Sequence, residues 1–377
     1  MAWPWKRETR DSQFIVPSEL NQTGDFAHVQ VTPESALRLS SVWACVRLLS
    51  DAVSTLPLDV FRNDEEIGLP ALLASPAAGW SLVEWVYAIM QSLLLRGNAY
   101  GLITARSGPR LTPAQVELVN PDNMTVMVDP DGRVAYRYKG REINREDLWH
   151  VRAFVTAGSP VGLSPIAYAQ ETIGLGLSTQ RFGRQFFTEG ASPSGILSIP
   201  TGTAMSQERV QAIKEMLRVA TRGKRDPLIV TGTADTKWQS ISIAPNESQF
   251  VESRRLGVAE IARTFGVPPE MIGGEAGGSL TYATVEGRAL DFVKFSLTPW
   301  IVRLEKAISD LLPRGQTVKF NVNALLRGTT KERYDAHKVA LDAGFMTVDE
   351  VRQLEDLPPL APGASQGPLR AVEGGAS

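Results

Sequence analysis

The sequence predicts an α+β protein that is mainly helical. Apolar residues recur at helical spacing in several segments between residues 33 and 355, whereas residues 98–152 consist of short β-prone runs separated by turns. Hydrophobic residues make up 43% of the chain and charged residues 21%, which is typical of globular proteins and excludes a disordered chain. At ~150 residues per domain, 377 residues indicate two or three structural units.

Charge and cysteine content narrow the class further. The 39 basic and 41 acidic residues give a net charge of −2, which argues against a protein that holds nucleic acid mainly by bulk positive charge. Cys45 is the single cysteine, so no internal disulfide can form. The N-terminus lacks the apolar core of a signal peptide, and the most apolar run, residues 85–95, falls short of the ~20 residues of a membrane span. We therefore expect a soluble protein that is made inside the cell and has no membrane partner.

The first helix is expected after residues 1–32, which show no sustained period and predict a flexible N-terminal arm. Thr32 supplies a hydroxyl cap, Pro33 occupies the first helical position and Glu34 lies in the first turn. The apolar stripe of this helix ends at Pro57 and comprises Val42, Val46, Leu49, Val53 and Leu56. Cys45 lies beside the stripe, which favours a small core residue over a nucleophile.

A second helix begins at Ser81, which forms a capping box with Glu84, and it ends before Gly97. Its apolar face consists of Trp85, Val86, Ile89, Met90, Leu93 and Leu94. The region that follows predicts strands at residues 100–103, 116–119, 124–128 and 134–138. The last two strands flank the turn Asp129-Pro-Asp-Gly132, so we expect them to form a hairpin.

A third helix is predicted from Ser164 to Gly190, and it contains three internal glycines, Gly174, Gly176 and Gly183. Each glycine costs ~1 kcal/mol of helix stability relative to alanine. Two interpretations follow from the residues alone. The helix surface is crowded by another backbone that approaches closely, or the helix is simply weak and kinked.

Residues 191–245 predict a small unit inserted between this helix and another at 247–265, which Gly266 and Pro268 terminate. The inserted unit contains a helix after Ser206, a strand at 227–231 and an alternating pattern at 238–243. Four basic residues gather near the end of its helix: Arg218, Arg222, Lys224 and Arg225. They either complement the dipole of the helix C-terminus or contact DNA phosphate or an acidic partner.

The last third of the chain begins with a glycine-rich loop, residues 273–281. A helix over 284–311 follows, and Pro299 inside it should kink it. A strand at 318–322 and a helical pair over 330–355 complete the ordered part. Residues 361–377 are rich in Gly, Ala, Ser and Pro and predict a disordered tail.

Motifs of catalytic chemistry are missing from the sequence. It has no Walker A loop, no Gly-x-Ser-x-Gly elbow and no HExxH or CxxC pattern, and its acidic pairs look like solvated turns. His28, His150 and His337 lie too far apart for a local zinc pattern. We therefore predict no cofactor, no metal and no enzymatic activity.

Six segments, taken in order, resemble the portal proteins of tailed bacteriophages, and in particular the siphophage-type branch also found in prophages and gene-transfer particles. The segments are Ser41-Val-Trp-Ala-Cys-Val-Arg-Leu-Leu-Ser-Asp-Ala-Val-Ser-Thr-Leu-Pro57, Leu95-Arg-Gly-Asn-Ala-Tyr-Gly101, Phe265-Gly-Val-Pro-Pro269, Pro299-Trp300, Asn323-Ala-Leu-Leu-Arg-Gly328 and Gly344-Phe-Met-Thr-Val-Asp-Glu-Val-Arg352. The resemblance covers about residues 33–360. The family usually has asparagine where this chain has Asp349.

The resemblance implies a ring, usually of twelve subunits, at one vertex of the capsid. Double-stranded DNA would enter and leave through the ring without sequence-specific contacts. The implied partners are other copies of the chain, the large terminase, the major capsid protein or scaffold, and a head–tail adaptor. The implied locations are the virion and, during assembly, the host cytoplasm.

The resemblance also divides the chain. It assigns 1–32 to the N-terminal arm, 33–163 to the wing, 164–190 and 246–268 to two stem helices, 191–245 to the clip, 269–283 to the tunnel loop, 284–323 to a long kinked wing helix and strand, 324–360 to the crown and 361–377 to the tail. The residues expected in the DNA channel are Gly273, Gly274, Glu275, Gly277, Gly278, Ser279, Leu280 and Thr281.

In a portal, the stem glycines would pack between subunits and the four clip bases would contact DNA or a partner. Two other classes of function remain open. One is a head–tail adaptor or minor capsid protein without its own DNA channel, and the other is a DNA-processing enzyme. The missing catalytic motifs disfavour the enzyme.

Overall fold

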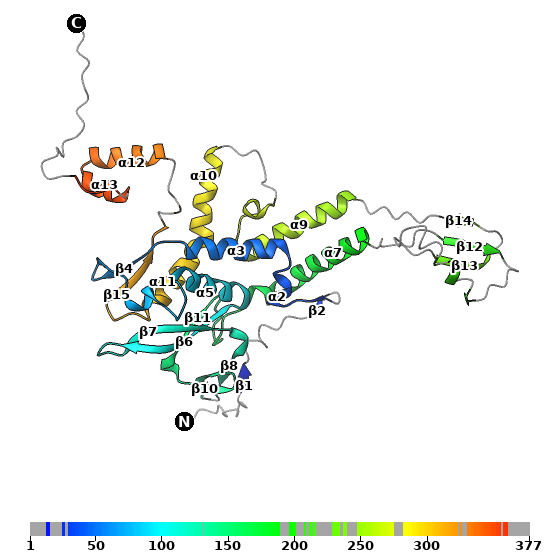
Figure 1. The fold of residues 1–377 in the computed structure, drawn as a ribbon, viewed down its shortest axis with the longest axis horizontal. Coiled ribbons are helices and arrows are strands. Elements are labelled where there is room, and N and C mark those ends of the chain that lie inside the picture. Colours follow the sequence, from blue (N-terminus) through cyan, green and yellow to red (C-terminus); the bar gives the residue numbers. More distant parts are fainter. Residues whose placement is uncertain are drawn as a thin grey trace, which may run out of the picture. The chain divides into compact units, whose positions relative to one another are not determined.

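The structure is a computed structural model (Figure 1). The chain forms two compact units, Met1–Phe320 and Asn321–Ser377. The residues that the structure describes are 13–15, 25–26, 29–129, 131–188, 196–200, 207–208, 211–213, 215, 228–233, 237–239, 247–274, 282–322, 325, 330–355 and 357–360. Helices and small sheets alternate along the described chain, as expected for an α+β fold.

The segment expected to form the arm contains strands β1 (Gln13–Ile15), β2 (Asp25–Phe26) and β3 (Val29–Gln30). Strand β1 pairs antiparallel with the distant strand β8 (Met124–Val128). The flexible arm over residues 1–32 stays a prediction, and the sequence did not predict the pairing of β1 with β8. A strand of two or three residues carries no measurable period, and its hydrogen-bond partners come from elsewhere in the chain.

The first predicted helix is two helices, α2 (Pro33–Ala36) and α3 (Ser40–Ser54). Thr32 caps α2 through Ser35, and the chain then turns at the buried Leu39, which adopts an extended conformation before α3. The predicted stripe of α3 is buried, so its role as the core face is confirmed.

Helix α5 (Leu82–Arg96) begins and ends as predicted. Ser81 and Glu84 form the capping box, and Gly97 ends the helix with a φ of 70°, a conformation that glycine adopts without strain. The helix packs on the antiparallel sheet β11–β6–β7, formed by β6 (Asn98–Ser107), β7 (Thr112–Val119) and β11 (Leu148–Arg152). The short helix α4 (Ala71–Ala74) contacts β7.

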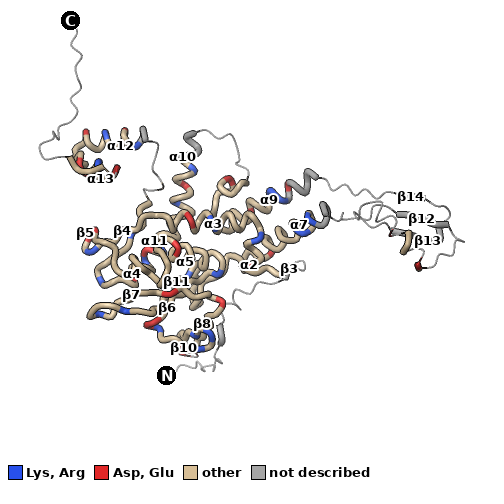
Figure 2. The backbone as a smooth tube through the Cα atoms, viewed as in Figure 1, with Lys and Arg blue, Asp and Glu red and all other residues tan. Residues whose placement is uncertain are grey.

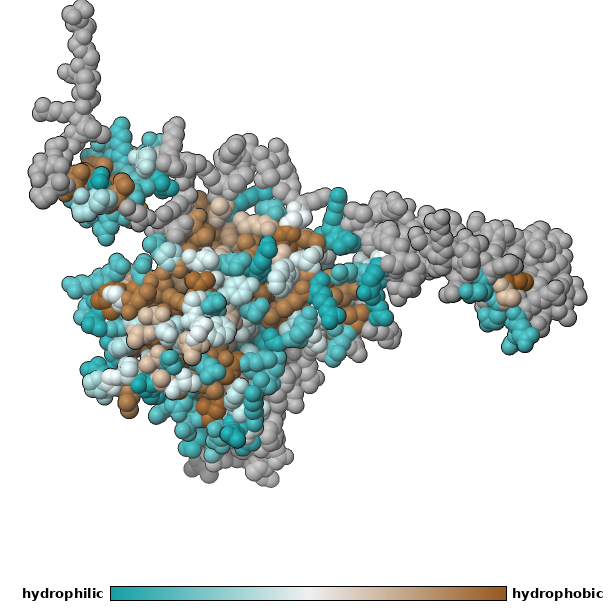
Figure 3. All heavy atoms as spheres, viewed as in Figure 1, coloured by the Kyte–Doolittle hydropathy of each residue, from teal (hydrophilic) through white to brown (hydrophobic). Residues whose placement is uncertain are grey.

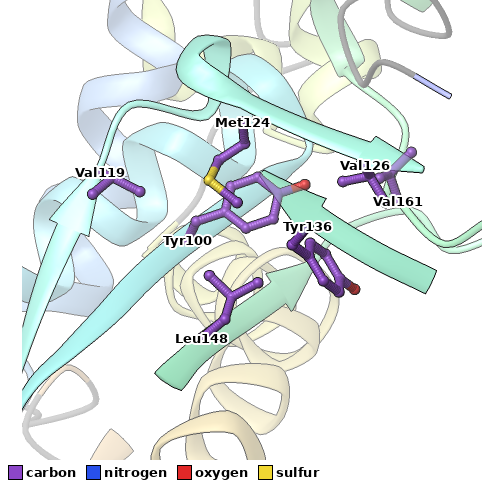
Figure 4. Packing of buried hydrophobic residues seen from close by; sticks show 7 residues of the cluster. All are labelled: Tyr100, Val119, Met124, Val126, Tyr136, Leu148 and Val161. Carbon is purple, nitrogen blue, oxygen red and sulfur yellow. The ribbon is translucent and has the colours of Figure 1, made fainter. Parts of the chain in front are cut away.

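A second sheet has the order β1–β8–β9–β10 and contains the predicted hairpin between β8 and β9 (Val134–Tyr138), followed by β10 (Arg141–Ile143). Short 3-10 turns lead into β8 and β11: η1 (Pro121–Asn123) and η2 (Arg145–Asp147). A small hydrophobic core joins the two sheets (Figure 4); it consists of Tyr100, Val119, Met124, Val126, Tyr136, Leu148 and Val161.

Helices α7 (Gln170–Thr188) and α9 (Glu247–Phe265) lie side by side (Figure 1). The third predicted helix is interrupted at Ala169, so a short helix α6 (Pro165–Tyr168) precedes α7. The chain between α7 and α9 contains the sheet β13–β12–β14, with strands β12 (Ile196–Pro200), β13 (Leu228–Thr233) and β14 (Lys237–Gln239). Strand β12 pairs parallel with β13 and was absent from the sequence prediction.

The segment predicted as one helix over 284–311 consists of α10 (Tyr282–Asp291), a π-helical turn η4 (Phe292–Leu297) and α11 (Thr298–Ser309). Strand β15 (Gln316–Phe320) packs on α11 and pairs with β4 (Leu58–Arg62), which forms a hairpin with β5 (Glu65–Ile67).

The second unit consists, in its described part, of α12 (Thr330–Asp342) and α13 (Val348–Leu354). Glu355 joins the two helices, because its carboxylate accepts hydrogen bonds from the Arg333 guanidinium at 2.8 and 2.9 Å. His337 Nε2 lies 3.1 Å from the same carboxylate.

Cys45 in α3 is fully buried, and burial raises the pKa of its thiol to about 12. We expect a maleimide or disulfide reagent to leave the native chain unmodified at about pH 8 and to label one thiol after denaturation in guanidinium, because only the thiolate reacts. Mass spectrometry of both samples checks this. Equal labelling rates in the native and denatured chain would contradict the buried position.

Candidate functional site

The predicted site residues fall into two groups. Glu275, Gly277, Gly278, Ser279, Leu280 and Thr281 lie outside the described residues, as do the four clip bases Arg218, Arg222, Lys224 and Arg225. Gly273, Gly274, Pro299 and the three glycines of α7 are described. The described residues therefore include the two ends of the predicted tunnel loop and helix α7, which packs beside α9.

The chain enters the loop through a series of tight turns. Helix α9 ends at Gly266, whose φ is 66°, and the 3-10 turn η3 (Pro269–Ile272) follows. The Gly274 amide donates a hydrogen bond to the Pro269 carbonyl at 2.7 Å. A Cβ atom on Gly274 would lie 2.7 Å from the same oxygen, so this position requires glycine.

The two ends of the loop are tied to each other. Arg288 of α10 forms an ion pair with Glu270 of η3 at 3.2 Å, and both side chains are partly buried. Ser296 Oγ, in the π-helical turn, donates a hydrogen bond to the carbonyl of Gly266 at 2.5 Å. The described parts on either side of residues 275–281 are thus held together at their base.

Pro299 lies in the first turn of α11, directly after the π-helical turn. Proline lacks an amide hydrogen, and its ring crowds the carbonyl four residues earlier in a regular α-helix. In this chain the wider turn of η4 occupies the residues before Pro299, and Thr298 Oγ1 donates to the Val293 carbonyl at 2.8 Å. Sequence alone indicated a disturbance at Pro299 but not its π-helical form.

The glycines of α7 have neighbours within the same chain. A Cβ atom on Gly176 would lie 3.0 Å from Leu39 Cδ1, so the missing side chain makes room for the turn between α2 and α3. Gly174 and Gly183 are buried as well. Crowding at Gly176 is therefore explained by Leu39, and packing of these glycines against a second subunit stays a prediction.

Large apolar side chains are exposed on α6 and α7 instead. Tyr168, Leu175 and Phe182 are 70%, 55% and 46% exposed. Leu175 and Phe182 are seven residues apart in α7 and therefore lie on one face of that helix, whereas Tyr168 precedes the interruption at Ala169. Figure 3 shows hydrophobic surface over the helical part of the first unit. The spacing of Leu175 and Phe182 is visible in the sequence and would have identified this face.

A buried polar network fixes the start of α6–α7 against the end of α5. The Asn98 side chain is fully buried; Nδ2 donates to the carbonyls of Gly162 and Arg96 at 2.8 and 3.1 Å. Asn98 Oδ1 accepts from the Gly162 amide at 2.8 Å and lies 3.0 Å from His150 Nε2. Ser164 Oγ, which caps α6, also donates to the Leu95 carbonyl at 2.8 Å.

The hydrogen bonds of the network fit a neutral His150. Asn98 Oδ1 can only accept, so Nε2 carries the proton and Nδ1 is left to accept from the Tyr136 hydroxyl at 3.4 Å. Burial lowers the pKa of His150 to about 3, with a further contribution from Arg152 and Arg145. The His150 ring also stacks on Tyr100, with ring centroids 4.2 Å apart.

Because the pKa of His150 is lowered in the folded chain, the folded chain should lose stability in acid. The unfolded chain binds a proton at His150 near pH 6.5 and the folded chain only near pH 3, so the unfolded state binds more protons between these values. The stability that His150 contributes is present above pH 6.5 and is lost as the pH falls toward 3, by up to about 1.4 kcal/mol per pH unit.

Urea unfolding at pH 7 and pH 5 measures this loss. His150→Gln can keep hydrogen bonds to Asn98 and Tyr136 but does not titrate, so its loss of stability between the two pH values should be smaller than that of the wild-type chain. Equal losses would show that other groups account for the acid sensitivity.

Two other kinds of site are absent from the described parts of the chain. None of the helices described is long and apolar enough to cross a membrane. Among the same residues, no three His, Cys, Asp or Glu side chains are grouped so that they could hold a metal ion.

Comparison with known proteins agrees with the order of elements described above. The family model "Phage portal protein" matches residues 40–356. The chain is 34% identical to the "Probable portal protein" of Streptomyces phage phiC31, over 89% of this chain and 78% of that protein. It is 29% identical to the "Portal protein" of Enterobacteria phage HK97, over 93% of this chain and 88% of the relative.

A solved structure has the same fold. A chain in the neck of a native gene transfer agent particle, computed with C12 symmetry, superposes with a TM-score of 0.60 over 93% of this chain and 97% of that one, at 22% identity. Because the family model spans most of the chain and a relative more than 30% identical covers most of both sequences, this chain belongs to the phage portal protein family.

Proposed function

We propose that this chain assembles into a ring at one vertex of a capsid and forms the conduit through which double-stranded DNA is packaged and ejected. The match to the portal family over residues 40–356 supports this function most directly. Head-to-tail contacts produce rings when the rotation closes, and the C12 symmetry of the gene transfer agent neck supports a ring of about twelve subunits. The chain itself would catalyse no reaction, and a separate terminase would supply the ATPase.

The proposed function assigns each region of the chain to one part of a portal subunit. Residues 33–163 form the wing, 164–190 and 246–268 the stem helices, 191–245 the clip, 269–283 the tunnel loop, 284–323 the wing helix and strand, and 324–360 the crown. The contact between α7 and α9 supports a stem made of paired helices. The ion pair between Arg288 and Glu270 supports a loop with a fixed base.

DNA would pass through without being held. A conduit has to touch phosphates without trapping them, because each neutralised phosphate adds salt-dependent affinity. The loop 273–281 carries Glu275 and no basic residue, and the whole chain has a net charge of −2. The bases Arg218, Arg222, Lys224 and Arg225 are then assigned to contacts with DNA or a docking partner at the clip.

The proposed partners follow from the place of the ring. The clip would meet the large terminase during packaging and a head–tail adaptor afterwards, and the wing would meet the major capsid protein or scaffold. The ring would be built in the host cytoplasm and remain in the virion. The exposed residues Tyr168, Leu175 and Phe182 form the surface of α6–α7 that we assign to the neighbouring subunit.

Electron microscopy with mass measurement of the purified chain at several salt concentrations tests the function. We expect rings of about twelve subunits with a central hole wide enough for duplex DNA. A small closed oligomer without a hole would favour the adaptor instead. Metal-dependent hydrolysis of DNA by the purified chain would contradict a purely structural role.

A further inference from the structure

A basic groove lies between strand β11 and helix α11 in the first unit. Its volume is about 530 Å³. Strand β11 is at the edge of its sheet, and the Trp149 indole donates from it to the Ala307 carbonyl of α11 at 2.9 Å. Because this partly buried hydrogen bond joins its two walls, the groove is a fixed feature of the fold.

The groove carries more positive than negative charge. Its charged lining residues are Arg106, Arg145, Arg152, Arg303, Lys306, Glu146 and Asp310. Arg106 pairs with Asp147 and Lys306 with Asp310. Among the ion pairs of the described residues, none involves Arg145, Arg152 or Arg303.

The arginines of the groove place positive charge beside His150 and Trp300. Arg303 packs over the Trp300 ring at 5.0 Å, and burial lowers the pKa of its guanidinium. Arg152 and Arg145 help to lower the pKa of His150. Arg303 is partly buried, whereas Arg145 and Arg152 are exposed, so a charged hydrogen bond from an incoming carboxylate would be strongest at Arg303.

A matching acidic feature projects elsewhere on the same unit. Strands β4 and β5 are joined by a two-residue turn in which Asn63 and Asp64 have φ values of 51° and 67°. Asp64, Glu65 and Glu66 follow one another at this turn, and all three are exposed. In the described part of the chain none of them forms an ion pair. Figure 2 shows acidic positions in red beside the label β5.

Helix α11 separates the hairpin from the groove. Its residues Glu305 and Ser309 face the hairpin's sheet, since they accept hydrogen bonds from the Phe320 and Val318 amides of β15 at 2.8 and 2.9 Å. The groove is lined from another face of α11, by Arg303, Lys306, Ala307 and Asp310. At about 100° per residue, the two faces are centred roughly 130° apart around the helix. The hairpin of one chain therefore cannot enter the groove of the same chain.

We propose that the acidic β4–β5 hairpin of one subunit docks into the basic β11–α11 groove of the next subunit in the ring. This contact rests on the proposed function, because a ring built from head-to-tail contacts needs two different, complementary patches on each subunit. Carboxylates at the hairpin tip would meet arginines that have no carboxylate partner among the described residues, although Arg62 lies opposite Glu65 on the hairpin itself. The charges would select the register of neighbouring subunits.

Engineered disulfides test the contact directly. Cys45 is buried and is the single cysteine, so cysteines introduced at the surface report on their own surroundings. In the full chain, Glu65→Cys combined with Lys306→Cys should give, on mild oxidation, a covalent ladder beyond the dimer up to the size of the ring. Each single variant, and Glu65→Cys combined with Arg141→Cys on the exposed strand β10, should give no ladder. Absence of a ladder in the first pair overturns the proposal.

Charge reversal gives an independent measurement. Arg152→Glu, and separately Glu65→Arg with Glu66→Arg, should each raise the protein concentration needed for half assembly by about tenfold at low salt. Combining the two should restore assembly. Arg303→Gln, which keeps a polar group of similar length, should weaken assembly in the same direction if Arg152→Glu proves unstable.

The outcomes separate this contact from the portal function itself. Rings that form equally well in every variant would keep the portal function and overturn the hairpin contact. Reversals that leave the ring intact but reduce retention of DNA in filled heads would assign the groove to phosphate and also overturn the contact. A wild-type assembly without a central hole would contradict the portal function instead.

Discussion

Asn98→Ala is expected to destabilise the first unit by about 3–5 kcal/mol, the largest loss that we predict for a single side chain. The substitution removes both hydrogen bonds that Asn98 donates to backbone carbonyls and the acceptor for the Gly162 amide. It also leaves His150 Nε2 without its partner. The hydrogen bonds between Asn98 and Gly162 are buried, and those to the Arg96 carbonyl and to His150 are partly buried. An unsatisfied buried polar group costs about 1–3 kcal/mol.

The measurement is urea unfolding followed by tryptophan fluorescence. Trp149 lies next to His150 in β11 and stacks on Trp85 with ring centroids 5.3 Å apart, so its emission reports on this part of the fold. Asn144→Ala serves as a matched control, because Asn144 is exposed and its side chain caps no turn. We expect a change below about 0.5 kcal/mol in the control. An equally small change in Asn98→Ala would show that water replaces the lost hydrogen bonds.

The elements that the sequence predicts best are those specified by neighbouring residues. The capping box of Ser81 and Glu84 and the left-handed Gly97 delimit α5 from within one segment. The hairpin of β8 and β9 is likewise set by its turn, and α9 has the bounds 247–265 that periodicity predicts.

The features that sequence analysis missed depend on contacts between distant segments. The turn between α2 and α3 places Leu39 against Gly176, more than a hundred residues later in the chain. The π-helical turn directs Ser296 to the carbonyl of Gly266. The partners of Asn98 come from β11 and from the segment before α6. The basic groove draws on β6, η2, β11 and α11, so no local pattern could indicate it.

In the candidate site, too, the sequence predicts features that depend on neighbouring residues and misses those that depend on distant contacts. Glycine content predicts a loop at residues 273–281, because a run of glycines favours neither helix nor strand. Residues 275–281 lie outside the described residues, so this stays a prediction. The anchors of that loop were not predicted, since Glu270, Arg288 and Ser296 become neighbours only when α9 and α10 are placed. These anchors make it possible to change the loop without disturbing the fold on either side.

Replacing Gly277 and Gly278 by proline is expected to abolish DNA packaging while rings still assemble. In the proposed ring the loop has to follow a DNA helix whose symmetry differs from that of the ring, so it needs backbone freedom that proline removes. The fold should tolerate the change, because Gly274 bonds to Pro269 and Arg288 pairs with Glu270 ahead of and behind the substituted residues.

The matched control is the double variant Gly277→Ala/Gly278→Ala, which restricts the backbone far less than proline and removes no amide hydrogen. Packaging is measured as the length of DNA protected from nuclease in heads assembled with each variant, and ring formation by electron microscopy of the same preparations. Loss of DNA in the proline variant, with intact rings and normal filling in the alanine variant, ties packaging to the mobility of this loop. Normal filling with the proline variant would mean that DNA passes a rigid channel, and the movement required for translocation would then have to come from the terminase alone.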